Sequence, residues 1–199
     1  MKKLVLASTS PYRRALLEQL RLPFECASSD VDEDIFKKEI ADPHELTQVL
    51  AKQKAKVIFD SLTPDEQREV VIIGGDQVSL HRGKVLGKPH TKENAVKQLL
   101  TLQGDNHQLI SATCVYTCDE VYEWSETTTM KMRPLSKEQA QNYVEKDLPL
   151  DCAGSYKIES LGINLFDAIT CPDYTAIIGL PLIRLSSYLR KVGLDPLNN

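Results

Sequence analysis

The sequence lacks the features that mark membrane proteins and nucleic-acid-binding proteins. No apolar run approaches the ~20 residues needed to span a bilayer. The chain starts Met-Lys-Lys and continues with only LVLAST before polar side chains, which is too short for the apolar region of a signal peptide. Positive charge is not in excess, because the formal net charge is −4 and the pI is near 5.6. We therefore expect a cytoplasmic protein that binds neither membrane nor nucleic acid and holds any phosphate in a local cluster.

The sequence also lacks the spacing of common metal-binding and covalent-catalysis motifs. Its five cysteines form no Cys-x-x-Cys pair, and its four histidines form no His-Glu-x-x-His. Buried free thiols are therefore favoured over a zinc site or a disulfide framework. There is no Gly-x-Ser-x-Gly, no Gly-x-Gly-x-x-Gly after the first strand and no P-loop motif. These absences disfavour a serine nucleophile, a dinucleotide fold and a P-loop enzyme.

The length and composition predict one sizeable globular domain over residues 1–199, or two tightly packed lobes that share a core, and the sequence shows no linker. Hydrophobic residues make up 42% and charged residues 26% of the chain, which is typical of proteins with a packed core. Strands and helices alternate at first, and a strand-rich middle follows, so we expect a mixed α/β (α+β) fold.

The predicted elements follow from caps, periodicity and apolar runs. Helices are expected from residue 11 and over 43–62, 91–104, 136–146 and 179–193, and strands over 3–7, 70–73, 108–118, 120–133 and 163–169. The apolar stripe of the second helix is expected to comprise Leu46, Val49, Leu50, Val57 and Ile58.

One aspartate stands directly after a buried-looking strand. The segment 70–79 reads VVIIGGDQVS, so Asp76 lies where α/β sheets usually build ligand sites. Lys88, in the turn-like LGKP, can fold back beside the same strand end. The pair could hold a metal and a phosphate, or Asp76 could be a turn residue and Lys88 a solvated lysine. The sequence leaves both interpretations open.

Three other segments carry groups that suit a phosphorylated ligand. ASTSPYRR offers a helix start with Arg13 and Arg14, either an anion site or a capped helix with two solvated arginines. VDED at 31–34 offers hard oxygen ligands for Mg²⁺ or Mn²⁺, or is an exposed acidic loop. Glu159, in CAGSYKIES, could face a pocket or lie on the surface. Carboxylates with separate basic groups point to metal-assisted attack of water on a phosphoanhydride.

Taken together, these segments resemble the Maf-like nucleotide pyrophosphatases, a family related in fold to the inosine triphosphate pyrophosphatases. The resemblance implies an elongated mixed sheet with two lobes flanking a cleft, usually assembled as a homodimer. It also implies cleavage of a nucleoside triphosphate between the α and β phosphates with a divalent metal. The matching segments occur in the family's order and are LVLASTSPYRRALLEQL, VDE, LAKQKA, IIGGDQV, GKP, AGSYKIES and IIGLPL.

The resemblance also implies roles for individual residues. Asp76 is expected to activate water and help to hold the metal, with Glu33 as a second carboxylate. The residues expected to cradle the triphosphate are Ser8, Arg13, Arg14, Lys54 and Lys88.

Within the family, the chain is similar to the branch that hydrolyses 7-methyl-GTP. Asp76-Gln77 stands where the branch acting on dTTP and UTP has Asp-Thr. The specificity positions are expected to be Tyr12, Gln77 and Glu159. Methylation at N7 gives guanine a positive charge, which Tyr12 can attract by a cation–π contact of ~0.5–2 kcal/mol. Tyrosine stands here in place of the more usual tryptophan and is the weaker partner.

The sequence leaves two alternatives to this function. A pyrimidine nucleotide (dTTP or UTP) is the nearest rival substrate, and Gln77 speaks against it. A nucleotide-binding regulator of cell division or septum formation without significant turnover would be favoured by missing carboxylates or phosphate ligands. The expected carboxylates and lysines are all present at Glu33, Lys54, Asp76 and Lys88.

Overall fold

The computed structural model describes residues 2–198, and its contacts divide the chain into two compact units. The first unit comprises Met1–Asp76, Ser111–Glu126 and Asp173–Asn199, and the second comprises Gln77–Ile110 and Thr127–Pro172. The sheet holds seven strands in the order β2-β1-β3-β5-β6-β7, with β4 paired to β3. Helices and strands are interspersed along the chain, so the predicted mixed α/β class is confirmed.

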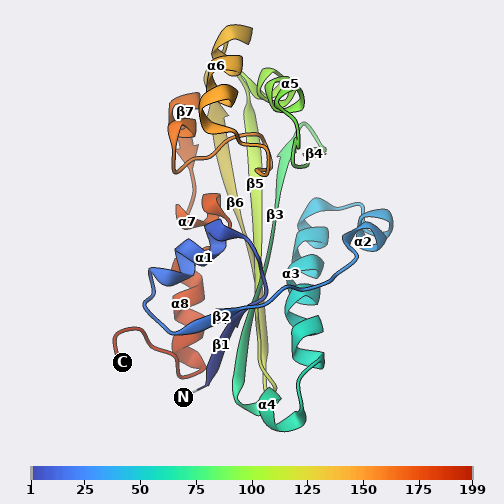
Figure 1. Ribbon diagram of the computed structural model, residues 1–199, viewed down its shortest axis with the longest axis vertical. Helices are drawn as coiled ribbons and strands as arrows, with labels where there is room; N and C mark the ends of the chain where they lie inside the picture. Colours follow the sequence, from blue (N-terminus) through green and yellow to red (C-terminus); the bar gives the residue numbers. More distant parts are fainter. Residues whose placement is uncertain (1, 199) are drawn as a thin grey trace. The chain divides into compact units, whose positions relative to one another are not determined.

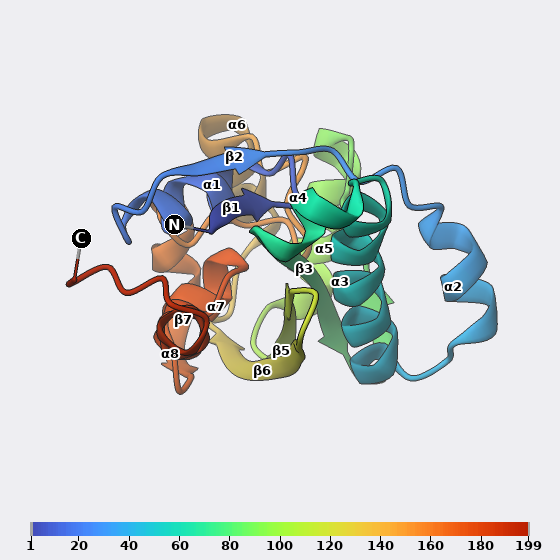
Figure 2. The same cartoon turned by 90° about the horizontal axis from the view of Figure 1, so that it is seen from below.

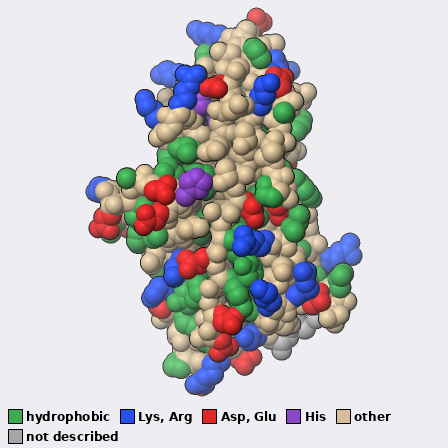
Figure 3. Space-filling model, turned by 180° about the vertical axis from the view of Figure 1, so that it is seen from behind, with side chains coloured by type: hydrophobic (Ala, Val, Ile, Leu, Met, Phe, Trp, Pro, Cys, Tyr) green, Lys and Arg blue, Asp and Glu red, His purple; other side chains and the backbone are tan. Residues whose placement is uncertain are grey.

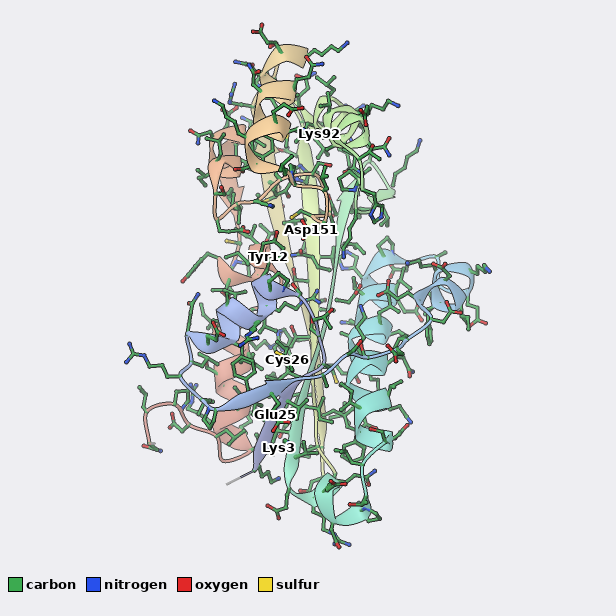
Figure 4. All side chains as sticks on the ribbon, viewed as in Figure 1. Lys3, Tyr12, Glu25, Cys26, Lys92 and Asp151 are labelled. Carbon is green, nitrogen blue, oxygen red and sulfur yellow. The ribbon has the colours of Figure 1, made fainter. Side chains whose placement is uncertain are left out.

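Parallel strands form the centre of the first unit. Strand β1 (Lys3–Leu6) lies between β2 (Phe24–Cys26) and β3 (Val70–His81) and runs parallel to both. Lys3 and Glu25 form an ion pair of 2.8 Å between β1 and the edge strand β2 (Figure 4). The unit also contains the end of β5 (Asn106–Tyr116) and the start of β6 (Val121–Met132).

Helices cover both faces of this part of the sheet, which explains why its strands are apolar throughout. Helices α1 (Pro11–Glu18) and α8 (Leu182–Lys191) lie on one face and α3 (Pro43–Asp60) on the other (Figures 1 and 2). Because side chains alternate along a strand, Val71 and Ile73 pack with α1 and α8, whereas Val70 and Ile72 pack with alanines of α3. The apolar run at 70–73 is thus a strand buried on both faces, as predicted.

Helix α3 packs unusually close to the backbone of β3. An added Cβ on Gly74 would stand 2.0 Å from the carbonyl oxygen of Ala51, so only glycine fits there. Ala51 and Ala55 of α3 are buried, whereas Val57 is 42% exposed. The prediction that Val57 belongs to the buried stripe is therefore wrong. Close packing against the sheet requires small side chains on α3, and a search for bulky apolar residues misses such a face.

The first unit also contains short helices that the sequence patterns did not indicate. They are α2 (Glu33–Glu39), α4 (Pro64–Arg68) and α7 (Thr175–Ile178). Asp32 caps α2, and Thr63 forms a capping box with Glu66 at α4. Helices this short have little periodicity, so caps of this kind are their main local signal.

The second unit is built on antiparallel pairs and two helices. Strand β3 continues through a turn at Arg82-Gly83, both with positive φ, into β4 (Lys84–Leu86). Strand β6 pairs antiparallel with β7 (Phe166–Thr170). Helices α5 (Lys92–Leu102) and α6 (Lys137–Asp147) pack together, capped by Thr91 and by the predicted box of Ser136 and Gln139.

Two predictions near the C-terminus and one on the cysteines need correction. Residues Leu161–Leu165 form the 3₁₀ helix η1, so the strand expected over 163–169 begins only at Phe166. The closing helix expected from residue 179 begins at Leu182, because Gly179 (φ 113°) ends α7. Within residues 2–198 no cysteine forms a disulfide, but Cys26 and Cys118 are exposed rather than buried, because they stand on an edge strand and beyond a strand end.

The surface carries mixed charge. Lys and Arg side chains are interspersed with Asp and Glu over the face seen in Figure 3.

None of the helices within residues 2–198 has the length and apolar character needed to cross a membrane.

Candidate functional site

Asp76, Lys54 and Glu33 meet in the first unit. The Lys54 ammonium lies 2.7 Å from Oδ1 of Asp76 and 2.7 Å from Oε1 of Glu33. The Asp76 side chain is 10% exposed and that of Lys54 13% exposed. Lys37 adds a second, more exposed contact of 3.2 Å to Oε2 of Glu33. Two carboxylates from distant parts of the sequence thus share one largely buried cation.

Each member of this trio is positioned by a different element. Asp76 extends from β3, two residues after Gly74, on which α3 packs. Lys54 stands on α3 between the buried Ala51 and Ala55, so the close helix–strand contact also fixes the ammonium. Glu33 is the first residue of α2, where the positive end of the helix dipole stabilises its negative charge.

Burial and the neighbouring charges act differently on the two carboxyl groups. Burial raises the pKa of Asp76 above its ordinary value, although Lys54 and Arg13 oppose the rise. Burial also acts to raise the pKa of Glu33, but hydrogen bonds and charges from Lys54 and Lys37 outweigh it and lower that pKa. Burial is thus the dominant effect at Asp76, whereas the neighbouring cations dominate at Glu33.

Arg13 lies next to this trio on α1. Burial lowers the pKa of its guanidinium, and the charges of Asp76 and Glu33 oppose that lowering. Its Nε donates to the carbonyl of Gly179 over 3.0 Å, and Nη1 donates to Oγ of Ser8 over 3.4 Å. An arginine in this position remains protonated and presents a fork of donors.

Ser8 and the start of α1 complete this part of the site. Oγ of Ser8 accepts from the N–H of Ser10, and Ser10 in turn caps α1 by accepting from the N–H of Arg13. Ser8 is 9% exposed. A hydroxyl, a guanidinium and a capped helix start therefore lie within one short stretch of chain, and the cap at Ser10 is the one that the sequence predicts.

Comparisons with known proteins identify the family. A family model described as "Maf-like protein" matches residues 3–192. The chain belongs to the Maf-like proteins. It is 44% identical to a protein of Bdellovibrio bacteriovorus over 97% of this chain and 98% of the relative. It is 41% identical to one of Colwellia psychrerythraea (99% and 96% covered) and 44% identical to one of Pseudomonas putida (97% and 98% covered). Each of these relatives is named 7-methyl-GTP pyrophosphatase.

Not every residue expected in the phosphate cradle of this Maf-like protein joins the trio. Arg14 is exposed on α1, and its Nε donates to Glu18 over 3.0 Å in an ion pair one turn along the helix. Consecutive helical residues point about 100° apart, so only one of the two arginines can face the sheet. Lys88 is exposed in the loop between β4 and α5 and belongs to the second unit.

The three positions expected to read the base lie on three different segments. Tyr12 is half-buried in the first turn of α1 in the first unit (Figure 4). Gln77 and Glu159 belong to the second unit. Gln77 follows Asp76 on β3, so its side chain points to the opposite face of the strand. Glu159 is exposed, in a turn whose neighbours Lys157 and Ser160 bond to Asp147 at the end of α6.

The donor set of this Maf-like protein fits a hard divalent cation that shares its ligands with a substrate. Within residues 2–198, no group of three or more His, Cys, Asp or Glu side chains is arranged to hold a metal ion. Asp76 and Glu33 direct two carboxylates at one cationic group, the Lys54 ammonium. Mg²⁺ is commonly bound by one or two carboxylates together with substrate phosphates and waters, so two carboxylates suffice for that mode.

Two contacts of the site were not found from the sequence. The carbonyl of Gly179 orients Arg13, but a backbone oxygen leaves no side-chain signal. Lys37 pairs with Glu33 at i,i+4 on α2. That spacing was available as a signal but depended on recognising the short helix.

Proposed function

We propose that this Maf-like protein hydrolyses 7-methyl-GTP between its α and β phosphates, giving 7-methyl-GMP and pyrophosphate. The observation that carries the proposal is the trio of Asp76, Lys54 and Glu33 beside Arg13. The names of relatives that are 41–44% identical over nearly the whole chain support the substrate. Such an enzyme removes a modified nucleotide from the cytoplasmic precursor pool.

Asp76 acts as the general base that takes the proton from the attacking water. Burial raises the pKa of its carboxyl group, and a carboxylate with a raised pKa accepts a proton more readily than an exposed one. Lys54 holds this carboxylate in place through a 2.7 Å hydrogen bond. Asp76 stands inside strand β3 (Val70–His81) rather than at the carboxyl end that the sequence suggested, and this rigid element keeps the base from turning away.

The chain's cationic groups bind the triphosphate. Arg13 donates from its terminal nitrogens to phosphate oxygens, and the Ser8 hydroxyl and the start of α1 add further donors. Lys54 and Lys88 are the remaining members of the proposed cradle, whereas Arg14, which is exposed and paired with Glu18, is left out of it. Together they offset charge that develops on the phosphates as the bond to the α phosphate breaks.

A divalent cation, Mg²⁺ or Mn²⁺, would be held by Asp76 and Glu33. When bound, it would supply Lewis-acid stabilisation of phosphate charge. Lys54 contacts the same two carboxylates, so its ammonium lies beside the position that such a cation would take.

Recognition of the methylated base is assigned to Tyr12, Gln77 and Glu159. The Tyr12 ring attracts the positively charged 7-methylguanine through a cation–π contact of ~0.5–2 kcal/mol. Glu159 accepts hydrogen bonds from the guanine edge and balances its charge, and Gln77 adds a further hydrogen bond.

We also infer a homodimer, which light scattering coupled to gel filtration measures directly.

Pyrophosphate release from a nucleotide panel tests the proposed function. The panel compares 7-methyl-GTP, GTP, dTTP, UTP and CTP in the presence of Mg²⁺ or Mn²⁺. A preference for 7-methyl-GTP that is lost in Asp76→Asn is the expected result. A preference for dTTP or UTP would overturn the base assignment while keeping the chemistry. Release from no nucleotide would overturn the enzymatic proposal.

A further inference from the structure

The guanidinium of Arg13 is held by a backbone carbonyl in the turn between α7 and α8. Its Nε donates to the carbonyl of Gly179 over 3.0 Å, and Nη1 donates to Ser8 over 3.4 Å. Gly75 of β3 also approaches the group closely, since a Cβ added to it would come within 3.3 Å of the same Nε. The guanidinium is planar and rigid, so fixing Nε restricts the direction of both terminal nitrogens.

The carbonyl of Gly179 belongs to a tight turn. Gly179 has a φ of 113°, and its N–H donates to the carbonyls of Thr175 and Ala176. Ser111 of β5 anchors α7 to the sheet by donating to the carbonyl of Ala176 over 2.6 Å. The orientation of Arg13 therefore depends on where this turn is held.

Asp173 closes the turn from both ends. Its Oδ1 accepts from the N–H and the hydroxyl of Thr175 over 2.9 and 2.6 Å, and its Oδ2 accepts from the N–H of Ile183 over 2.8 Å. The Thr175 oxygen in turn accepts from the N–H of Leu182 over 2.8 Å. Asp173 is only 4% exposed, so these bonds are shielded from water.

This carboxylate replaces the cap that α8 lacks locally. Pro181 occupies the N-cap position of α8 and offers no side-chain hydrogen bond. Asp173 and Thr175 therefore satisfy the first N–H groups of α8 from outside the helix, where a negative charge is also favoured. A single side chain thus ties the start of α7 to the start of α8 and encloses Gly179 between them.

We propose that Asp173 is a positioning residue for the phosphate-binding arginine. Asp173 fixes the α7–α8 turn, the turn fixes the carbonyl of Gly179, and this carbonyl aims the guanidinium of Arg13. The inference rests on the proposed function in so far as Arg13 binds substrate phosphate. Asp173 itself touches neither substrate nor metal in this scheme.

Substitution by asparagine isolates this role. The side chain of the Asp173→Asn variant keeps nearly the same shape but has only one acceptor oxygen, which cannot serve both Thr175 and Ile183. One end of the turn is therefore released. Thr175→Val removes the hydroxyl that accepts from Leu182, whereas Thr175→Ser keeps it and serves as the conservative rescue.

The kinetic test compares these variants with a control variant that removes a helix cap at α4, far along the chain from Arg13. We expect Asp173→Asn and Thr175→Val to lower kcat/KM for 7-methyl-GTP by about 10- to 100-fold, the scale of a small misplacement of a binding group. Thr175→Ser should restore most of it. Thr63→Ala, which removes the cap of α4 in the same unit, should change the melting temperature without changing kcat/KM.

A double-mutant cycle decides whether Asp173 acts through Arg13. In an Arg13→Lys background the donor to Gly179 is gone, so Asp173→Asn should cost less than about 2-fold in kcat/KM. Equal losses in the two backgrounds would overturn the inference. The inference would also fail if Asp173→Asn lowered only the melting temperature and left kcat/KM unchanged in an active enzyme.

An NMR measurement tests the positioning without turnover. The Nε–H signal of Arg13, assigned by its loss in Arg13→Lys, should exchange with solvent about tenfold faster or more in Asp173→Asn than in the wild type. Unchanged exchange would overturn the inference even if the variant were less active. Loss of this protection in a protein that releases pyrophosphate from no nucleotide would instead support the positioning and overturn the proposed function alone.

Discussion

The ammonium of Lys54 lies midway between two acids, 2.7 Å from Oδ1 of Asp76 and 2.7 Å from Oε1 of Glu33. The three side chains come from a helix, a strand and the first residue of a second helix. Each carboxylate that contacts Lys54 is an oxygen donor that a divalent cation would also use. Lys54 and a metal therefore compete for the same oxygens.

We expect Lys54→Gln to bind Mn²⁺ about tenfold more tightly than the wild type in the absence of nucleotide, because no ammonium then occupies the carboxylates. Titration calorimetry measures this affinity. Lys52→Gln is the matched control, since Lys52 lies on the same helix and pairs with Glu123. Unchanged Mn²⁺ affinity in Lys54→Gln would argue that Asp76 and Glu33 do not hold the metal.

Asp76→Asn should keep the fold and reduce turnover of 7-methyl-GTP by roughly 10² or more, because asparagine cannot accept the proton of the attacking water. Circular dichroism and pyrophosphate release measure the two effects. Asp34→Asn changes an exposed neighbour of Glu33 in the same way and should leave turnover nearly intact. Comparable turnover in a folded Asp76→Asn protein would remove Asp76 from the role of base.

Glu159→Ala should damage hydrolysis of 7-methyl-GTP more than hydrolysis of GTP, because only the methylated base carries the charge that the carboxylate balances. Comparison of kcat/KM for the two nucleotides gives the selectivity. Glu138→Ala, at an exposed glutamate on α6, is the control. Equal losses for both nucleotides would take Glu159 out of base recognition.

The stability of the protein should fall in mild acid because of His107. Burial, the largest cause, and the neighbouring His81 lower the pKa of His107 from 6.5 to about 4, while Asp105 opposes the shift. The pKa of His107 is lower in the folded protein than in the unfolded chain. At pH values between these two pKa values, the unfolded chain therefore binds more protons than the folded protein. The free energy of unfolding should therefore drop by ~2 kcal/mol from pH 7 to pH 5.

Urea unfolding at the two pH values measures this drop. His107→Gln should be less stable at pH 7, because the 2.8 Å hydrogen bond to Tyr156 is altered, but it should lose less stability on going to pH 5. His44→Gln removes a histidine from α3 instead and should keep the wild-type drop. The same drop in His107→Gln as in the wild type would assign the acid sensitivity to other groups.

Gly74→Ala should destabilise the protein by about 1–3 kcal/mol, because the new Cβ would stand 2.0 Å from the carbonyl of Ala51. Thermal unfolding measures the effect. Gly87→Ala is the matched control, since a Cβ there meets nothing within 4 Å. Similar melting temperatures for the two variants would show that α3 can move away from β3 without cost.

The local parts of the fold could be predicted because their signals are local. The cap at Ser10, the box of Ser136 and Gln139 and the buried run at 70–73 each stand within a few residues of what they determine. The short helices α2 and α7 and the 3₁₀ helix η1 were missed, since each has too few residues to show a period. Leu46 and Leu50 are buried on α3 as predicted. Val57 was misplaced because the packed face continues through Ala51 and Ala55 rather than through a bulky residue.

The sequence by itself determined which groups are available to the site. It placed Asp76 directly after a buried strand segment and put Ser8 and Arg13 at a capped helix start, because strand burial and capping are short-range properties. The tertiary structure alone decided which of these groups meet. Lys54 joins Glu33 to Asp76, Arg13 rather than Arg14 turns toward them, and Asp173 ties together two helix starts, since such contacts depend on how distant segments pack.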